Sequence, residues 1–158
     1  MRRSLFLLSF SGLLLATVCP VASAVIPDPT FSHCDQKISV GPTGACPFSV
    51  TVYDMFANLL ANATVVVDFG TCPVVLSPSQ DPEFTVSGAT ISGMTNAQGV
   101  VVFRIRGTGG GSCAVKVRAA SASQPTIFVQ FCSFSSVQVC QTTPAHQHSW
   151  GKLRTIYR

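Results

Sequence analysis

The sequence predicts an all-β domain held together by disulfides, and three features of the chain support this prediction. Between Cys34 and Cys140, short segments rich in valine, phenylalanine and threonine follow one another, and several alternate apolar with polar residues. Turn signals built from glycine, proline and asparagine separate these segments. Six cysteines are spread over the same stretch. None of the segments has the 3.6-residue period of an amphipathic helix.

The expected strands follow the alternation of apolar residues along the chain. They span residues 48–53, 64–69, 84–86, 89–91, 100–106, 114–118, 127–131 and 137–140. The side chains expected to point into the core are Phe48, Val50, Val52, Val65, Val67, Val101, Phe103, Ile105, Val115 and Val117. Seven or eight short strands with turns at this spacing are typical of an immunoglobulin-like β-sandwich.

Residues 1–24 have the pattern of a secretory signal peptide. Arg2 and Arg3 precede an apolar run of about fifteen residues, and a stretch of small residues ends at Ala24. The run is shorter than the roughly 20 residues of a spanning helix, so cleavage after Ala24 is favoured over a membrane anchor. We therefore expect a secreted or cell-surface protein whose mature chain of 134 residues has no membrane span.

Cleavage would remove Cys19 and leave an even set of cysteines. The remaining six are Cys34, Cys46, Cys72, Cys113, Cys132 and Cys140. In an oxidising compartment such a set forms disulfides, although six cysteines allow 15 pairings. The pairing we expect joins neighbours along the chain, 34–46 and 132–140, together with 72–113. Zinc is the alternative, and it is disfavoured because the chain has no CxxC pair; we expect no metal and no cofactor.

The mature chain divides into three parts. Residues 25–33 are expected to form an extended lead-in, residues 34–140 the sandwich, and residues 141–158 a basic, flexible tail. The tail has three basic residues and no acidic one, whereas the rest of the mature chain has five basic and six acidic residues. The positive charge is therefore a property of the tail and the leader.

Two segments resemble the group 1 bacterial Ig-like domains, the modules stacked in invasin and intimin. The first runs from Val-Thr-Val-Tyr-Asp at 50–54 to Asn-Ala-Thr-Val-Val-Val at 62–67, and the second is Thr-Asn-Ala-Gln-Gly-Val-Val-Val-Phe at 95–103. The resemblance covers about residues 48–117 and implies the sandwich fold and an adhesive role. It makes Asp54 and Asn58 the residues that hold a turn, and Gly99 a glycine with positive φ. It brings no catalytic residue. Leu59 stands where the family often has proline, and Asn96 where it more often has aspartate.

Composition also argues against an enzyme. The only histidines of the mature chain are His33, in the lead-in, and His146 and His148, in the tail, so no histidine lies where a catalytic triad would need it. The six acids do not form an evident pair for glycoside cleavage, and Asp81 with Glu83 offers too few ligands for calcium. A metal-binding role for His146 and His148 is less favoured than a solvated tail.

One group of basic residues could form a binding surface. If the glycine-rich stretch 107–111 closed a hairpin, then Arg104, Arg106, Lys116 and Arg118 would share the outer face of two paired strands. Such a face could bind an anionic glycan or an acidic protein, and the alternative is a solubilising surface. Nucleic acid is disfavoured because no aromatic residues interleave the basic ones.

Two functions remain open on the sequence. The first is a non-catalytic binding or adhesion module, secreted or at the cell surface. The second is a structural subunit of a surface layer or fibre that self-associates through the tail or an open sheet edge. The structural reading rests on the tail and on four apolar residues expected to be exposed: Met55, Phe56, Phe128 and Phe134.

Overall fold

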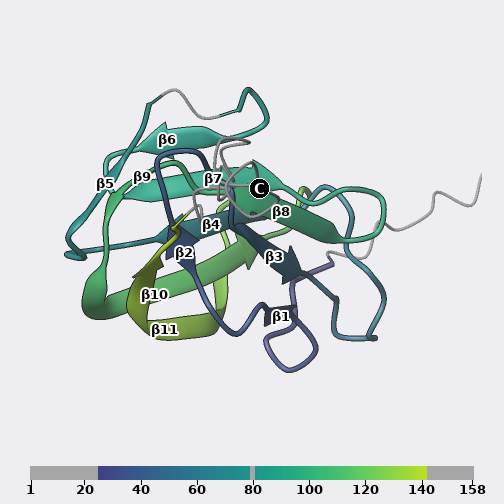
Figure 1. Ribbon diagram of the computed structural model, residues 1–158. Helices are drawn as coiled ribbons and strands as arrows, with labels where there is room; N and C mark the ends of the chain where they lie inside the picture. The colour runs from purple at the N-terminus through teal and green to yellow at the C-terminus, as the bar shows by residue number, and fades with distance from the viewer. Residues whose placement is uncertain (1–24, 79–80, 142–158) are drawn as a thin grey trace, which may run out of the picture.

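The structure, a computed structural model, describes residues 25–78 and 81–141 and is all-β in this part of the chain (Figure 1). Its strands are β1 (His33–Cys34), β2 (Ser39–Val40), β3 (Pro47–Thr51), β4 (Thr64–Asp68), β5 (Val74–Leu76), β6 (Thr85–Ser87), β7 (Thr90–Met94), β8 (Val100–Arg104), β9 (Gly107–Gly109), β10 (Gly111–Ala120) and β11 (Val129–Val139). Over the described ranges, no helix is long and apolar enough to cross a membrane.

The strands form three sheets. A three-stranded sheet has the order β1-β3-β8, a six-stranded sheet the order β2-β11-β10-β4-β7-β6, and β5 and β9 form a two-stranded ribbon. All pairings are antiparallel except that of β2 with β11. Register shifts interrupt the pairing of β10 with β11 after Ser112 and after Val117. Bulges of this kind bend a strand, and both strands curve visibly in Figure 1.

The core consists of the inward-facing residues of the two larger sheets. Every side chain that the alternation assigned to the core is buried. Phe48 of β3 connects the sheets, since its ring lies 6.5 Å from that of Phe103 on β8 and 5.5 Å from that of Phe134 on β11. Phe84 completes the aromatic cluster, with its ring 5.2 Å from that of Phe103. Phe134 therefore packs against the core, and the expectation that it is exposed is wrong.

The expected strands are present, with two kinds of correction. Residues 127–131 and 137–140 were expected as two strands but belong largely to the single long strand β11. The short strands β1, β2, β5 and β9 were not expected, so the described residues contain eleven strands rather than seven or eight. Two or three residues are too few to display an alternation, which is why the sequence pattern does not reveal these strands.

All six cysteines of the described residues form disulfides, but two of the three expected pairings are wrong. Cys34 bonds to Cys132, Cys46 to Cys140, and Cys72 to Cys113, of which only the last was expected. Cys132 lies within β11 and Cys140 just after it, so eight extended residues separate them by about 26 Å. Cys34 pairs with Val50 on β3. Val50 lies four residues after Cys46, which corresponds to about 13 Å along the extended chain. Disulfide-bonded Cα atoms lie at most about 7 Å apart, so neither neighbouring pair can bond.

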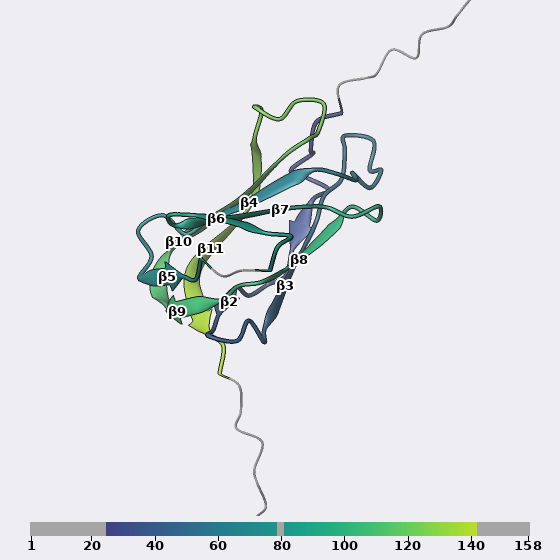
Figure 2. The ribbon, with the colours of Figure 1, turned by 90° about the horizontal axis from the view of Figure 1, so that it is seen from above.

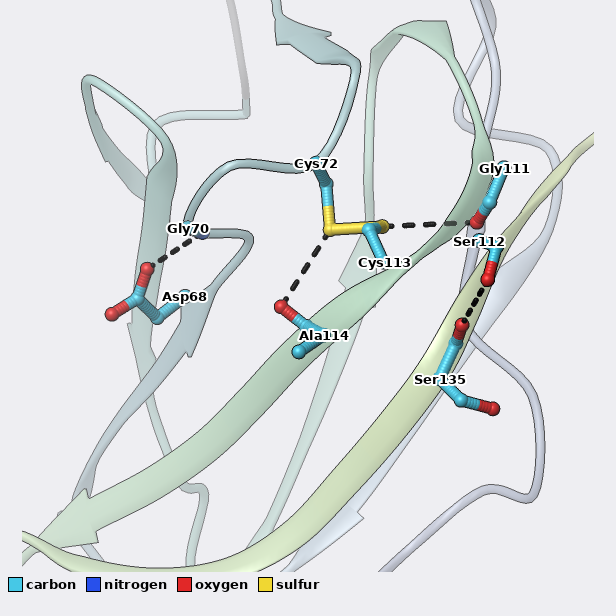
Figure 3. The surroundings of a disulfide bond; sticks show 8 residues. All are labelled: Asp68, Gly70, Cys72, Gly111, Ser112, Cys113, Ala114 and Ser135. Carbon is cyan, nitrogen blue, oxygen red and sulfur yellow. Dashed lines mark hydrogen bonds between the residues drawn. A yellow bond between two sulfur atoms is a disulfide. The ribbon is translucent and has the colours of Figure 1, made fainter.

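The Cys72–Cys113 disulfide fastens the segment after β4 to the start of β10 (Figure 3). Cys72 Sγ lies 3.6 Å from the carbonyl oxygen of Ala114. The turn before it is closed by Gly70, whose backbone N–H donates to Asp68 Oδ1 at 2.9 Å. The carboxylate of Asp68 thus stabilises the turn at the end of β4.

The connections of the two larger sheets define two ends of the molecule. The segments 52–63, 95–99 and 121–128 join β3 to β4, β7 to β8 and β10 to β11. The register places all three at the same end, as shown by the pairs Thr51↔Val100, Thr64↔Met94, Thr64↔Ala120 and Val129↔Ala119. The first described residues enter here too, whereas the last leave from the opposite end (Figure 2). We call residues 25–32, 52–63, 95–99 and 121–128 the loop end.

Candidate binding surface at the loop end

The turn after β3 is held by the carboxylate of Asp54. The backbone N–H groups of Phe56 and Asn58 both donate to Asp54 Oδ1 at 2.8 Å, and Asn58 Nδ2 donates to Oδ2 at 3.2 Å. The expectation that Asp54 and Asn58 hold this turn is confirmed, although the side chain of Asn58 bonds to Asp54 and not to the backbone. The hydrogen bond from the backbone N–H of Asn58 is the main reason why the pKa of Asp54 lies below its ordinary value of 3.8.

The neighbouring turn of residues 95–99 is packed against this one. Gly99 has a φ of 67°, as expected, and its carbonyl oxygen accepts a hydrogen bond from the N–H of Val52 at 2.9 Å. A Cβ at Gly99 would also lie 2.9 Å from the Val52 carbonyl oxygen, so only glycine fits. Thr95 is buried, and its hydroxyl donates to the Leu60 carbonyl at 2.7 Å. The two turns therefore form one rigid unit.

The lead-in is not simply extended, because it contains a turn of its own. Asp28 Oδ1 accepts hydrogen bonds from the N–H groups of Thr30 at 2.7 Å and Phe31 at 3.3 Å. The N–H of Asp28 donates to the Tyr53 carbonyl at 2.8 Å. This bond attaches the lead-in to the turn that follows β3.

These fixed turns carry most of the large apolar side chains that are exposed in the described residues. Within the loop end, Phe56 and Met55 are the most exposed, at 71% and 63%. The exposed apolar residues of the loop end are Ile26, Phe31, Met55, Phe56, Leu59, Ile127 and Phe128. The exposure expected for Met55, Phe56 and Phe128 is confirmed. The guanidinium of Arg118, on β10, lies 5.4 Å from the centre of the Phe128 ring and helps to place that ring.

The loop end is also almost without available charge. Its four segments contain no lysine or arginine, and their only acids are Asp28 and Asp54. Both carboxylates accept hydrogen bonds from backbone N–H groups of their own turns. The loop end therefore presents apolar side chains together with uncharged polar ones, among them the exposed Asn62, Asn96 and Gln98.

The depressed pKa of Asp54 predicts how the stability of the domain depends on pH. Because the folded-state pKa lies below the unfolded value of 3.8, this carboxylate stabilises the fold above that pH and ceases to do so as the pH falls through the folded pKa. We expect Asp54→Asn to lower the thermal unfolding midpoint at neutral pH. The difference from wild type should shrink as the medium is acidified below 3.8. A difference that is the same at every pH would contradict this role of the charge.

The basic face expected from the sequence is not formed. β9 pairs with β5 and β10 pairs with β4 and β11, so residues 107–111 do not close a hairpin between β8 and β10. Arg104 consequently belongs to the three-stranded sheet, while Lys116 and Arg118 belong to the six-stranded one. Arg106 lies after β8, and its Nη2 is 3.0 Å from Asp81 Oδ1. The predicted hairpin is absent because the glycines of this stretch let the segment of β5 approach closely and pair with β9. A Cβ at Gly107 or Gly109 would collide with the backbone of residues 73–75.

Other chemistry has little support in the described residues. Within 25–78 and 81–141, no group of three or more His, Cys, Asp or Glu side chains could hold a metal ion. A cavity of about 260 Å³ lies between residues 36–38 and 133–138, and its lining includes Lys37, Phe134 and Gln138 but no acid, histidine or free thiol. The expected tail, with His146 and His148, lies outside the described residues.

The fold and the surface define a disulfide-stapled all-β domain with an apolar, rigid loop end. Comparison with protein-family models, with curated proteins and with solved structures finds no match to this chain. The loop end as a whole was missed by the sequence reasoning, which noticed only some of its residues. The available signal was the excess of apolar residues in segments that also contain turn residues, as in Asp-Met-Phe-Ala-Asn at 54–58.

Proposed function

We propose that this protein is a secreted or cell-surface, non-catalytic binding module with an immunoglobulin-like sandwich, and that it binds its partner through the loop end. The main observation in support is that seven exposed apolar side chains lie at one end of the described fold. Exposed apolar residues that are scattered singly are ordinary, whereas a concentration of them marks an interaction surface. Complete burial of a fully exposed apolar side chain contributes about 1.5–3 kcal/mol, and these side chains, which are 37–71% exposed, can gain a corresponding part of that on binding.

The rigidity of the loop end supports the same proposal. Its turns are fixed by the carboxylates of Asp28 and Asp54 and by the buried hydroxyl of Thr95. The Cys34–Cys132 disulfide ties the strand that follows the lead-in to β11. A preorganised surface loses less conformational entropy when it binds, so more of the contact energy becomes affinity.

The alternative function, a structural subunit, was based on residues 141–158 and on four apolar residues, of which Met55, Phe56 and Phe128 are exposed and belong to the loop end. Nearly all of that segment lies outside the described residues, and Phe134 is no longer an exposed residue in its favour. The anionic partner suggested by four clustered basic residues also loses its basis, because the topology separates them. Binding through the apolar loop end is therefore the function that the described residues favour.

A retention experiment tests whether the loop end is an accessible apolar binding surface. We expect the exported protein to be retained on a phenyl matrix at high salt, and Met55→Ser/Phe56→Ser to elute markedly earlier because two protruding side chains are lost. The matched control is Val75→Ser/Val139→Ser, which removes two apolar side chains of similar exposure, 70% and 56%, outside the loop end. If the control elutes as early as the loop variant, the loop end is not the main apolar surface.

A further inference from the structure

We propose that a second site on this domain binds a single sugar residue that carries one carboxylate, such as a uronic acid unit of a polysaccharide. The site is the cavity of about 260 Å³ between residues 36–38 and 133–138, which we call the β11 cavity. This inference goes beyond the proposed function, because the lining of the β11 cavity shares no residue with the loop end. Its polar lining residues are Gln36, Lys37, Ser133, Ser135, Ser136 and Gln138.

The β11 cavity lies where the chain crosses from one sheet to the other. β1 belongs to the three-stranded sheet and β2 to the six-stranded one, and residues 35–38 between them run beside β11 (Figure 1). The crossing is attached to β11 at both ends, by the Cys34–Cys132 disulfide and by the pairing of Ser39 with Gln138. Both walls are therefore in place before a ligand binds, and a preorganised site loses less conformational entropy on binding.

The polar side chains of the β11 cavity are available to a ligand. Among residues 25–78 and 81–141, none of the six polar lining side chains has a hydrogen-bond or ion-pair partner. Asp35 forms no ion pair with Lys37, and its Oδ2 instead accepts a hydrogen bond from the N–H of Ser49 on β3 at 2.6 Å. The loop end differs in this respect, since both of its carboxylates accept hydrogen bonds within their own turns.

The chemistry of the lining matches an anionic sugar. Lys37 provides one positive charge and the lining has no acid, so a singly charged anion is favoured over a cation. Serine hydroxyls and glutamine amides both donate and accept hydrogen bonds, which suits the hydroxyl groups of a sugar. Phe134 is partly buried and adds an aromatic ring, against which the C–H groups of a sugar ring can pack.

The dimensions of the β11 cavity limit its ligand to one such unit. Drug-sized ligands occupy pockets of about 300–1,000 Å³, and the volume of about 260 Å³ lies just below this range. Ser133, Ser135 and Ser136 are exposed, so the cavity opens to solvent. A polysaccharide can therefore place one residue in the cavity while the neighbouring residues of the polymer remain in solvent.

Titration of the exported protein, followed by nuclear magnetic resonance, tests the proposal. The probes are the methyl glycosides of galacturonic and glucuronic acid, and the matched neutral probes are those of galactose and glucose. We expect at least one uronoside to cause saturable shifts of the backbone amides of residues 36–38 and 133–138. Its neutral match should bind about 5-fold more weakly, the effect of one exposed ion pair. Lys37→Gln should remove this difference, whereas Arg104→Gln, which takes the same charge from β8 outside the lining, should leave it unchanged.

The other outcomes overturn the proposal. If no uronoside causes saturable shifts at these residues, the β11 cavity is not a sugar site. Equal affinity for acetate and for the uronosides would make it a general anion site. Ser136→Trp fills the cavity and should abolish binding; unchanged affinity in this variant, with a dispersed amide spectrum that shows it to be folded, would place the ligand elsewhere. Met55→Ser/Phe56→Ser should bind the uronosides like the wild type, which keeps this test independent of the loop end.

Discussion

Replacing Cys34 and Cys132 together by alanine should lower the free energy of unfolding by about 3 kcal/mol. This disulfide connects β1 of the three-stranded sheet to β11 of the six-stranded sheet and closes a loop with a sequence separation of 98. Because the Cys46–Cys140 disulfide remains, the ring that Cys34–Cys132 closes in the unfolded chain has only about 20 residues, for which the chain-entropy description gives roughly 3 kcal/mol. Equilibrium unfolding in urea, followed by circular dichroism under non-reducing conditions, measures the loss.

The second long-range disulfide provides a matched control. With Cys34–Cys132 intact, Cys46 and Cys140 close the same ring of about 20 residues, so their joint replacement by alanine should cost nearly the same amount. A loss below about 1 kcal/mol for the Cys34–Cys132 pair would show that the unfolded chain is already restricted in other ways. A difference of more than about 2 kcal/mol between the two pairs would point to native-state contacts rather than chain entropy.

Phe48→Ala should destabilise the fold by about 3–5 kcal/mol, the usual cost of emptying a buried phenylalanine site. Phe48 is fully buried and contacts the rings of Phe103 on its own sheet and Phe134 on the facing sheet. Removing it leaves a cavity between the two sheets, and backbone pairing on both sides hinders its collapse. Thermal and urea unfolding of the variant measure the effect.

Phe56→Ala is the control for that substitution, since it removes the same side chain from an exposed position. It should change the free energy of unfolding by no more than about 0.5 kcal/mol. Equal losses in the two variants would mean that the core is not organised around Phe48. Together the two substitutions separate the phenylalanines that build the fold from those proposed to bind.

The local parts of the fold could be predicted because they depend on neighbouring residues. The alternation in 48–52 and 100–105 directs Val50, Phe103 and Ile105 inward, and all three are buried. Asp54 and Gly99 were correctly assigned to turns, because a carboxylate that bonds nearby N–H groups and a positive φ are set within a few residues. An even count of cysteines after the expected signal peptide likewise indicated disulfides before their partners were known.

The candidate site could be predicted only in part. Met55, Phe56 and Phe128 were correctly expected to be exposed, yet their presence at one end follows from strand directions that no single segment encodes. The prediction that four basic residues share one face was wrong for the same kind of reason. Whether residues 107–111 close a hairpin or pair with β5 depends on a competition with a strand more than thirty residues earlier in the chain.

The sequence by itself determined that this protein is all-β over its described residues, which side chains form its core, and that its six cysteines can pair. The tertiary structure alone decided which cysteines bond, which sheets Arg104 and Lys116 belong to, and that the exposed apolar side chains meet at the loop end. The physical reason is the range of the interactions. Alternation and turn preference act over a few residues, whereas sheet order and cysteine proximity are set by contacts between segments tens of residues apart.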